Sequence, residues 1–413
     1  MNIEDSNKTI FVEYDSKVSV SYNHKVLVVV DGLFYNGKDL RRKHSIALHS
    51  SDAEMISTLV ENGNLALEDI EGKFALLIVK RQTQEVLCAV DRFGEKKLCY
   101  TVNDNRAIVS TNAKDIARIR NDYSMDDFAI GMYFAHNYIC APYTIFRKVY
   151  KIEPGSMVKF EGTKYETYKY WNVISLIQQY KNTNLTISFE DAKEDFKRIL
   201  NRTIAKREQS FDCCRMALLL SGGIDSSVLC SLLRNHNGIK AYSARLKDEK
   251  NNKLDESDSA NTIAKKFGVP IDVISIDPDA IKQDLLKIQV STDEPMANKS
   301  YSVVAWLIER AKKDGYNCVI TGDGGDELFL GYPHYQRMIK SQKLSNCFSV
   351  LPPVFNSLLR TVAPRKLYDV LVYSKTSPMG QYLTAIRGEM LSALLKKTIQ
   401  HSGSLLLSKS EIV

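Results

Sequence analysis

The chain has 413 residues, which is enough for two or more domains with hydrophobic cores of their own. Hydrophobic residues make up 44% and charged residues 25%, as in ordinary globular proteins, and neither a membrane span nor a signal peptide is predicted. The eight cysteines include no C-x-x-C pair, so neither a zinc site nor a disulfide framework is expected. We therefore expect a cytoplasmic protein whose cysteines are reduced.

The formal net charge of +7 is concentrated in residues 341–413, which contain nine Lys and Arg against three Asp and Glu. The rest of the chain is therefore close to neutral. A basic tail of this kind is typical of a solvated helical face, so nucleic acid is not expected as a partner. Prolines at 352, 353, 364 and 378 divide the tail into short helical segments.

Residues 1–110 are predicted to be mostly β structure. Residues 18–22 alternate between apolar and polar side chains, as a half-buried strand does. The other predicted elements are strands at 25–30, 74–79 and 85–90, turns at 34–37 and 80–84, and a helix at 52–62 that ends at Asn62-Gly63.

A polar stretch, 178–185, predicts a linker after this N-terminal part. Ser188 and Asp191 then predict the capped start of a helix. Its apolar face, expected to pack on a sheet, consists of Ala192, Phe196, Ile199, Leu200 and Ile204.

From Met216 onward, strands and helices alternate, which predicts right-handed βαβ units and a parallel sheet whose loops collect along one edge. The predicted elements are strands at 217–220, 240–245, 271–275 and 316–320, helices beginning after 223 and at 257–267, 279–289 and 301–312, and loops at 246–255 and 293–295.

The segment Ser-Gly-Gly-Ile-Asp-Ser-Ser at 221–227 joins the first of these strands to a helix. Two glycines can take positive φ, and the N–H groups at a helix N-terminus favour phosphate. Ser226 and Ser227 add hydroxyl donors, and Asp225 adds a carboxylate that can hold Mg²⁺ against phosphates. The lysine and spacing of a Walker A loop are absent. The alternative is an ordinary turn whose serines cap the helix.

A second loop, 321–327, follows the strand at 316–320 and holds three glycines and three acids in seven residues. The carboxyl end of a strand is where open α/β sheets bind ligands. Carboxylates this dense repel one another, so the loop predicts a bound cation.

These two loops carry a family resemblance. Residues 221–227 are similar to the pyrophosphate loop of N-type ATP pyrophosphatases. With Asp293-Glu294-Pro295 and 321–332, they closely resemble the synthetase domain of asparagine synthetases and their relatives, the β-lactam synthetases and lasso-peptide cyclases.

The resemblance implies an α/β plus α+β protein. A degenerate N-terminal-nucleophile-type sandwich at 1–175 would precede a doubly wound, HUP-like ATP pyrophosphatase domain at 186–340, and the helical segment at 341–413 would be shorter than in the family. The family's Arg-Val-Pro-Phe-Leu-Asp-like segment and acyl-adenylate lysine are not found. Candidates for the lysine by residue type alone are Lys366, Lys375 and Lys396.

The N-terminal part is similar to the glutaminase domain of glutamine-dependent amidotransferases, in the order and spacing of the segments 33–36, 50–54, 71–74 and 91–94. Three departures predict that it does not hydrolyse glutamine. Asn2 stands where such an enzyme needs a cysteine, and the first cysteine is Cys88. The Arg-Gly-Pro-Asp segment is missing, and Glu71 replaces an oxyanion-hole Asn, where its charge would repel an oxyanion.

Site residues follow from the same resemblance. The residues implied to cradle the β,γ-phosphates of ATP are Ser221, Gly222, Gly223, Ser226 and Ser227. Those implied to hold Mg²⁺ are Asp225 and Asp326, and those that flank adenosine are Leu218, Leu220, Thr321 and Gly322, with the backbone near 242–244. Those in the place of the acyl substrate and the incoming amine are Asp323 and Glu327.

The implied activity is an AMP-forming amide ligase that uses ATP and Mg²⁺. A small-molecule or peptide carboxylate attacks the α-phosphorus, pyrophosphate leaves, and ammonia or an amine displaces AMP. A second copy of the chain or an ammonia-supplying protein is a further partner option. The alternatives are a β-lactam synthetase- or lasso-cyclase-type intramolecular amide former, a truncated nucleotide-binding pseudoenzyme and, last, a tRNA-modifying enzyme.

Overall fold

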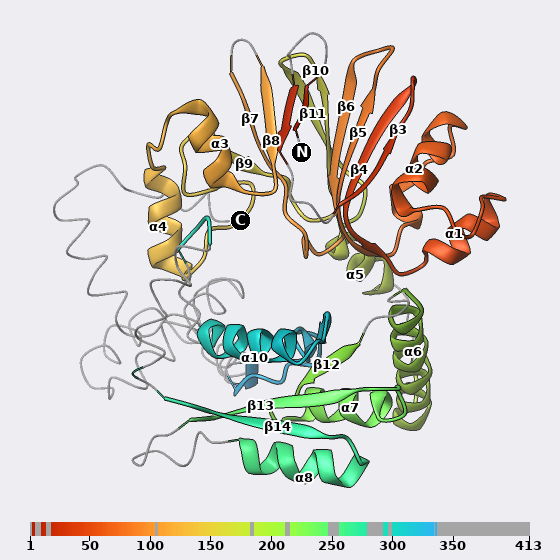
Figure 1. Ribbon diagram of the computed structural model, residues 1–413, viewed down its shortest axis with the longest axis vertical. Helices are drawn as coiled ribbons and strands as arrows, with labels where there is room; N and C mark the ends of the chain where they lie inside the picture. Colours follow the sequence, from red (N-terminus) through yellow and green to blue (C-terminus); the bar gives the residue numbers. More distant parts are fainter. Residues whose placement is uncertain are drawn as a thin grey trace, which may run out of the picture.

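The computed structural model describes residues 2–4, 10–13, 18–103, 106–181, 186–210, 215–246, 256–277, 279, 292–295, 300–333 and 335–336. Several predicted elements lie outside these residues: positions 247–255 of the loop at 246–255, positions 182–185 of the linker at 178–185, the helix at 279–289 apart from Asp279, the segment at 341–413 and the three candidate lysines. Figure 1 shows two bodies, one above the other: an N-terminal body made of two β-sheets, and a parallel-sheet body. In the described ranges, no helix is long and apolar enough to cross a membrane.

The N-terminal body contains a five-stranded sheet, ordered β1-β2-β8-β7-β9, and a six-stranded sheet, ordered β11-β10-β6-β5-β4-β3. Its strands are β1 Asn2–Glu4, β2 Ile10–Glu13, β3 Ser19–Tyr22, β4 Val26–Phe34, β5 Gly72–Lys80, β6 Glu85–Val90, β7 Cys99–Val102, β8 Ala107–Ser110, β9 Tyr150–Lys151, β10 Ser156–Glu161 and β11 Lys164–Lys169. Its helices are α1 Gly37–Lys43, α2 Asp52–Glu61, α3 Ala113–Arg120 and α4 Asp127–His136.

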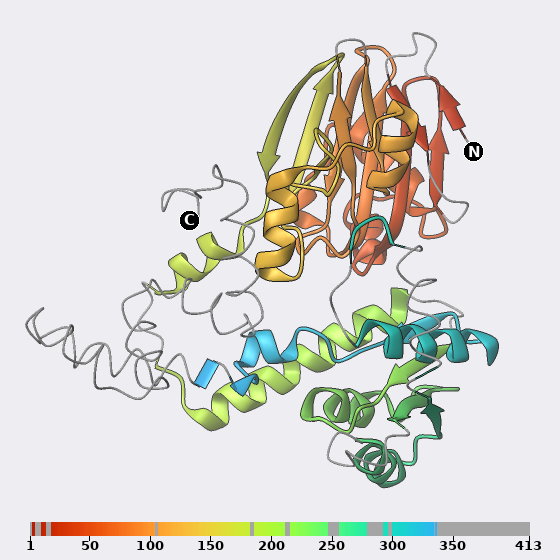
Figure 2. The same ribbon diagram turned by 90° about the vertical axis from the view of Figure 1, so that its left-hand side faces the viewer.

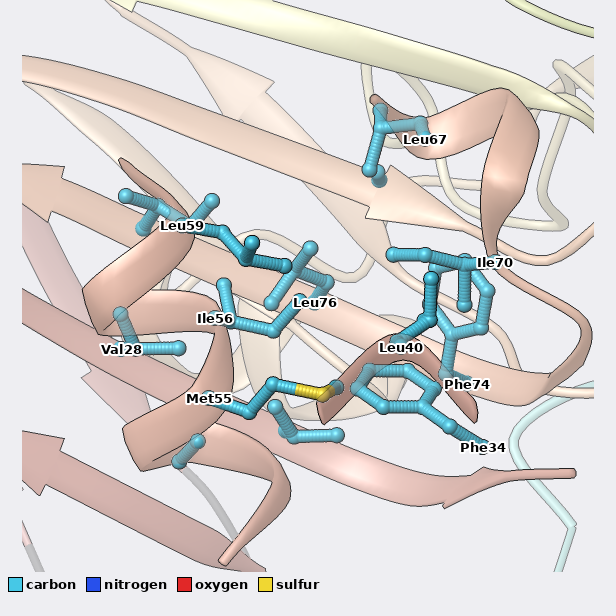
Figure 3. Close-up of a cluster of buried hydrophobic side chains, with 14 of the residues drawn as sticks. Val28, Phe34, Leu40, Met55, Ile56, Leu59, Leu67, Ile70, Phe74 and Leu76 are labelled. Carbon is cyan, nitrogen blue, oxygen red and sulfur yellow. The ribbon is translucent and has the colours of Figure 1, made fainter. Parts of the chain in front are cut away.

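The apolar run at 26–30 lies in strand β4, and it is apolar throughout because both faces of the sheet are covered. Leu27 and Val29 belong to the core between the two sheets, whereas Val28 and Val30 belong to the core beneath α2. Figure 3 shows this second core, in which side chains of α2 lie against those of β4 and β5. Successive side chains of a strand point to opposite faces, so one run of five residues supplies two cores.

Helix α2 begins with a capping box. Ser51 Oγ accepts a hydrogen bond from Glu54 N at 3.2 Å, and Glu54 Oε2 accepts one from Ser51 N at 2.6 Å. We expect Ser51→Ala to lower the free energy of unfolding by about 1 kcal/mol, because an N–H of the first turn loses its acceptor. Urea denaturation measures this, with Ser51→Thr as the control that keeps the hydroxyl. Equal midpoints for the two variants would contradict the capping box.

The parallel-sheet body is built on strands in the order β14-β13-β12-β15, and every pairing is parallel, as predicted. The strands are β12 Met216–Leu219, β13 Lys240–Leu246, β14 Ile271–Ile276 and β15 Cys318–Ile320. The helices are α6 Phe189–Ser210, α7 Ile224–Leu233, α8 Ser257–Phe267, α10 Tyr301–Lys313 and α11 Gly325–Phe329. Side chains of α6, α7 and α8 share one core with the sheet, and those of α10 share another, so helices cover both faces (Figure 1).

Two predictions were wrong in part. The linker at 178–185 is helical in its first part, because α5 runs over Val173–Lys181. Of the predicted apolar face of α6, Leu200 and Ile204 pack on the core of the sheet as expected, whereas Phe196 and Ile199 are 42% and 55% exposed. The reason is length, since 22 residues of helix extend about 33 Å, and the short strands of the sheet cover only part of that distance. Phe196 contacts Phe329 of α11 instead, with 5.2 Å between the ring centroids.

Candidate functional site

Both glycine-rich loops leave the sheet at its carboxyl edge, side by side. Strand β12 leads into 221–227, and strand β15 leads into 321–327. The two strands are neighbours, with Leu218 opposite Ile320. Strands β13 and β14 extend the sheet on one side of β12, and β15 lies on the other side. The chain therefore reverses its strand order between these two loops, which is the place where open α/β sheets bind ligands.

Gly222 sets the shape of the first loop. Its φ is +84°, and a Cβ at this position would lie 2.7 Å from the backbone N of Ala260 in α8. Gly223, by contrast, has a φ of −69°, so only one of the two glycines needs positive φ. Position 222 therefore requires glycine, both because φ is positive and because α8 leaves no room for a side chain there.

The serines of this loop do not cap helix α7. Gly223 occupies the N-cap, so no N-cap side chain accepts a hydrogen bond from the first turn, and the backbone N–H that donates to Ser221 Oγ is that of Gly223, at 3.2 Å. The hydroxyls of Ser226 and Ser227 instead donate to the carbonyl oxygen of Gly223, at 3.3 and 2.6 Å. An uncapped helix start presents N–H donors and the positive end of its dipole to an anion. This geometry favours the phosphate-binding interpretation over the simple capped turn.

The second loop lies directly against Asp225. A Cβ on Gly322 would lie 3.1 Å from both Asp225 Cβ and Ser226 N, and a Cβ on Gly325 would collide with the Asp225 carboxylate. Glycines at these two positions are therefore what allow the loops to meet. The structure thus brings the two predicted halves of the site together.

The acids of the second loop also act electrostatically on Asp225 of the first loop. The pKa of Asp225 is raised, first by burial and then by the negative charges of Asp326 and Glu327. Such a group of carboxylates attracts a cation. Among the described residues, no cluster of three or more His, Cys, Asp or Glu side chains could hold a metal ion. Mg²⁺ commonly takes one or two carboxylates and completes its shell with phosphate oxygens and water, so Asp225 and Asp326 fit it only together with a phosphate ligand.

The remaining acids of the second loop are exposed and bonded locally. Asp323 Oδ2 accepts a hydrogen bond from Thr321 Oγ1 at 2.7 Å, and Glu327 Oε1 accepts one from Tyr332 Oη at 3.0 Å. Burial, and then this contact with Glu327, raise the pKa of Tyr332 to about 12. Tyr332 was not singled out from the sequence, although it lies within the 321–332 segment that carried the resemblance.

Leu218 and Leu220 lie beneath the loops. Their side chains are fully buried in the core shared with α7 and α8. The backbone N of Leu220 donates to the carbonyl oxygen of Tyr242 at 2.9 Å. These leucines pack in the core on which the two loops rest, and their contact with adenosine stays a prediction.

Glu71, the predicted obstacle to glutamine hydrolysis, is paired across the two bodies. Its Oε2 accepts a hydrogen bond from Lys206 Nζ of α6 at 2.6 Å, and its backbone N donates to Asn36 Oδ1 at 2.9 Å. One residue along α6, the Arg207 guanidinium lies 4.3 Å from the centroid of the Tyr35 ring. The sequence carried no signal for Lys206, which is 135 residues from its partner.

Asn2, which stands at the nucleophile position, and Cys88, the first cysteine, both lie in strands. Asn2 lies in β1 and pairs with Glu13 of β2. Cys88 is in β6 and wholly buried, and burial raises the pKa of its thiol. A thiol of this kind is a poor nucleophile because little of it is thiolate at neutral pH.

The family model for asparagine synthase matches residues 195–403, a little over half of the chain, and the model for the glutamine amidotransferase domain matches residues 17–171. The chain belongs to the asparagine synthase family. Both resemblances found in the sequence are thereby confirmed at the level of the family.

Among curated relatives, this asparagine synthase-family protein is 25% identical to asparagine synthetase [glutamine-hydrolyzing] 1 of Bacillus subtilis (strain 168), over 81% of this chain and 52% of the relative. It is 24% identical to amidase chry2 of Gibberella zeae, over 70% of this chain and 44% of that one. The chain spans about half the length of these relatives. Among solved structures, an NH3-dependent NAD synthetase from Campylobacter jejuni is 15% identical, covers 53% of this chain and 96% of its own, and has a TM-score of 0.25.

Proposed function

We propose that the protein is an AMP-forming carbon–nitrogen ligase of the asparagine synthetase type. The observation that carries this is the meeting of the two loops at the strand-order reversal, with Asp225 between the glycines of the second loop and repelled by Asp326 and Glu327. Family membership supports the same chemistry. The N-terminal body is then an N-terminal-nucleophile-type sandwich within 1–175, and the parallel-sheet body is a HUP-like domain within 186–340.

In this proposal, N–H groups of the loop at 221–227 and the hydroxyls of Ser226 and Ser227 bind the β,γ-phosphates of ATP. Asp225 and Asp326 would hold Mg²⁺, which when bound would neutralise negative charge on the phosphates. The substrate carboxylate attacks the α-phosphorus, the bond to the β-phosphate oxygen breaks, and pyrophosphate leaves. Asp323 and Glu327 orient the acyl group and the amine, which attacks the acyl carbon, loses a proton and expels AMP.

The nitrogen in this proposal does not come from glutamine hydrolysed by the same chain. The Glu71 carboxylate, unlike the amide of an Asn, has no N–H to donate to an oxyanion, and it is already bound to Lys206 Nζ. Cys88, the first cysteine of the sequence, is buried in a strand, and burial makes its thiol a poor nucleophile. Ammonia or an amine of the substrate remains as the nitrogen source.

We expect pyrophosphate release when the protein receives ATP, Mg²⁺ and a suitable acid from a panel of amino-acid and peptide carboxylates, and amide formation on addition of ammonium. Glutamine should not replace ammonium, because the groups that would hydrolyse it are absent or blocked. Coupled pyrophosphate detection and mass spectrometry of the product measure both results. The control omits the acid.

Three outcomes would contradict parts of this proposal. Amide formation with glutamine alone would show that the N-terminal body hydrolyses it. Amide formation without any added nitrogen source would favour the intramolecular ligase of the β-lactam synthetase or lasso-cyclase kind. Absence of pyrophosphate with every acid would favour a nucleotide-binding pseudoenzyme.

A further inference from the structure

The described segment 292–295 lies against the lower end of the N-terminal body, although it precedes α10 of the parallel-sheet body. Figures 1 and 2 show this short segment beside α3 and α4. It contains two adjacent acids, Asp293 and Glu294, whose side chains are only 10% and 17% exposed. Adjacent carboxylates normally remain in water, so their burial here requires partners.

Both carboxylate oxygens of Asp293 accept hydrogen bonds from the N-terminal body. Lys97 Nζ donates to its two carboxylate oxygens at 2.6 and 2.5 Å, and the backbone N of Ala113 donates to Oδ2 at 2.8 Å. Ala113 is the first residue of α3, so the carboxylate also lies at the positive end of a helix dipole. Burial lowers the pKa of Lys97, but the nearby Cys99, Asp293 and Glu294 outweigh burial, so the net pKa is raised and the ammonium stays charged.

Glu294 is held in the same way. Lys151 Nζ donates to its Oε2 at 2.6 Å, and the backbone N of Ile145 donates to its Oε1 at 3.2 Å. Lys151 is itself 13% exposed and also donates to the carbonyl oxygen of Ile139 at 2.9 Å. Each acid thus receives one lysine and one backbone N–H, all from the N-terminal body. These acids are therefore not available to ligate a metal or a substrate.

The held segment precedes the helix that covers one face of the sheet. Helix α10 begins at Tyr301, and its Leu307 and Ala311 share a core with Leu219 of β12 and Val319 of β15. These two strands carry the two glycine-rich loops. A displacement of the segment that reaches α10 along the chain would therefore be passed to these strands through packed side chains.

We propose that Lys97 and Lys151 are positioning residues, and that the N-terminal body serves the ligase site by holding the Asp293–Glu294 segment, which precedes α10 in the chain. This gives a role to a body that supplies no ammonia. The expected effect of the two lysines on catalysis rests on the proposed function, whereas their effect on how firmly the segment is held does not. The set formed by these two lysines and two acids is called the clasp below.

The test compares Lys97→Gln, Lys151→Gln and the double variant with wild type. The matched control is Lys43→Gln, which removes an ion pair of the same 2.6 Å length between Lys43 and Asp69, within the N-terminal body. Hydrogen exchange of peptides covering 292–295 and the start of α10 should become at least about tenfold faster in the clasp variants and not in the control, because a buried charge loses its partner. Exchange in β5 should stay slow, which shows that the fold persists.

Activity supplies a second measurement. The clasp variants should lower kcat for pyrophosphate formation by about tenfold and leave KM for ATP within about twofold, because the phosphate-binding loop itself is intact. Lys97→Arg should restore kcat, because it keeps a positive charge opposite Asp293. A merely structural ion pair would lower the melting temperature without this split between kcat and KM.

Unchanged exchange in the double variant would overturn the clasp. A loss of kcat that Lys97→Arg does not restore would also overturn it. If wild type releases no pyrophosphate with any acid, the proposed function fails, and the exchange measurement alone decides whether the N-terminal body holds the segment.

Discussion

Asp225→Asn should lower the rate of pyrophosphate formation by about 10²–10³-fold and, at pH 7, make the protein more stable than wild type. The loss of activity follows because an amide lacks the charge that holds Mg²⁺ against the phosphates. The gain in stability follows from the raised pKa of Asp225, since burial and the charges of Asp326 and Glu327 disfavour the ionised form in the folded protein.

The pH dependence of this gain has a definite sign. The pKa is higher in the folded than in the unfolded state, so the folded state binds the proton more tightly and wild type loses stability as the pH rises between these two pKa values. Asp225→Asn removes that loss. Its advantage should therefore be full at pH 7 and vanish below the usual aspartate pKa of 3.8, where the carboxyl is protonated in both states.

Melting temperatures at pH 7 and at a pH below 3.8, with Asp127→Asn on the exposed surface of α4 as the control, measure this effect. Adding Mg²⁺ and ATP should raise the melting temperature of wild type more than that of Asp225→Asn. Retained activity would remove Asp225 from the site. If Asp225→Asn were less stable than wild type at pH 7, the ionised Asp225 side chain would be stabilising the fold and not destabilising it.

Gly222→Ala should destabilise the protein by about 2–5 kcal/mol, the sum of two costs. A non-glycine residue at a φ of +84° costs about 1–2 kcal/mol, and forcing a methyl group into a filled space costs about 1–3 kcal/mol. The filled space is the start of α8, where Ser259 Cβ and Ala260 N would lie 2.6 and 2.7 Å from the new Cβ.

Gly238→Ala is the matched control. Gly238 has a similar φ of +78°, but a Cβ added there would have nothing within 4 Å, so this variant should show only the conformational cost of about 1–2 kcal/mol. Urea unfolding of the two variants separates the costs. Equal destabilisation would mean that the loop at 221–227 does not press against α8, and the phosphate-binding turn would then be held by other contacts.

The sequence by itself determined the local parts of the site. Apolar residues before Ser221, two glycines, and apolar spacing after them predicted strand β12, the turn and helix α7, because each signal acts within a few residues. Helix α8 was predicted at its observed bounds for the same reason, since Gly268 can take the left-handed conformation that ends it. The sequence also suggested that acids in two distant loops would share one place, since parallel strands end at one edge.

Only the tertiary structure decided how those parts meet. Nothing near Gly325 in the sequence indicates that it must be glycine to accommodate Asp225, and nothing near Lys97 indicates Asp293 as its partner, 196 residues away. Charged side chains carry no periodic signal, so their partners depend on which surfaces the two bodies bring together. The apolar face of α6 shows the same limit, because its pattern marked a buried face but could not tell how far the sheet beneath it extends.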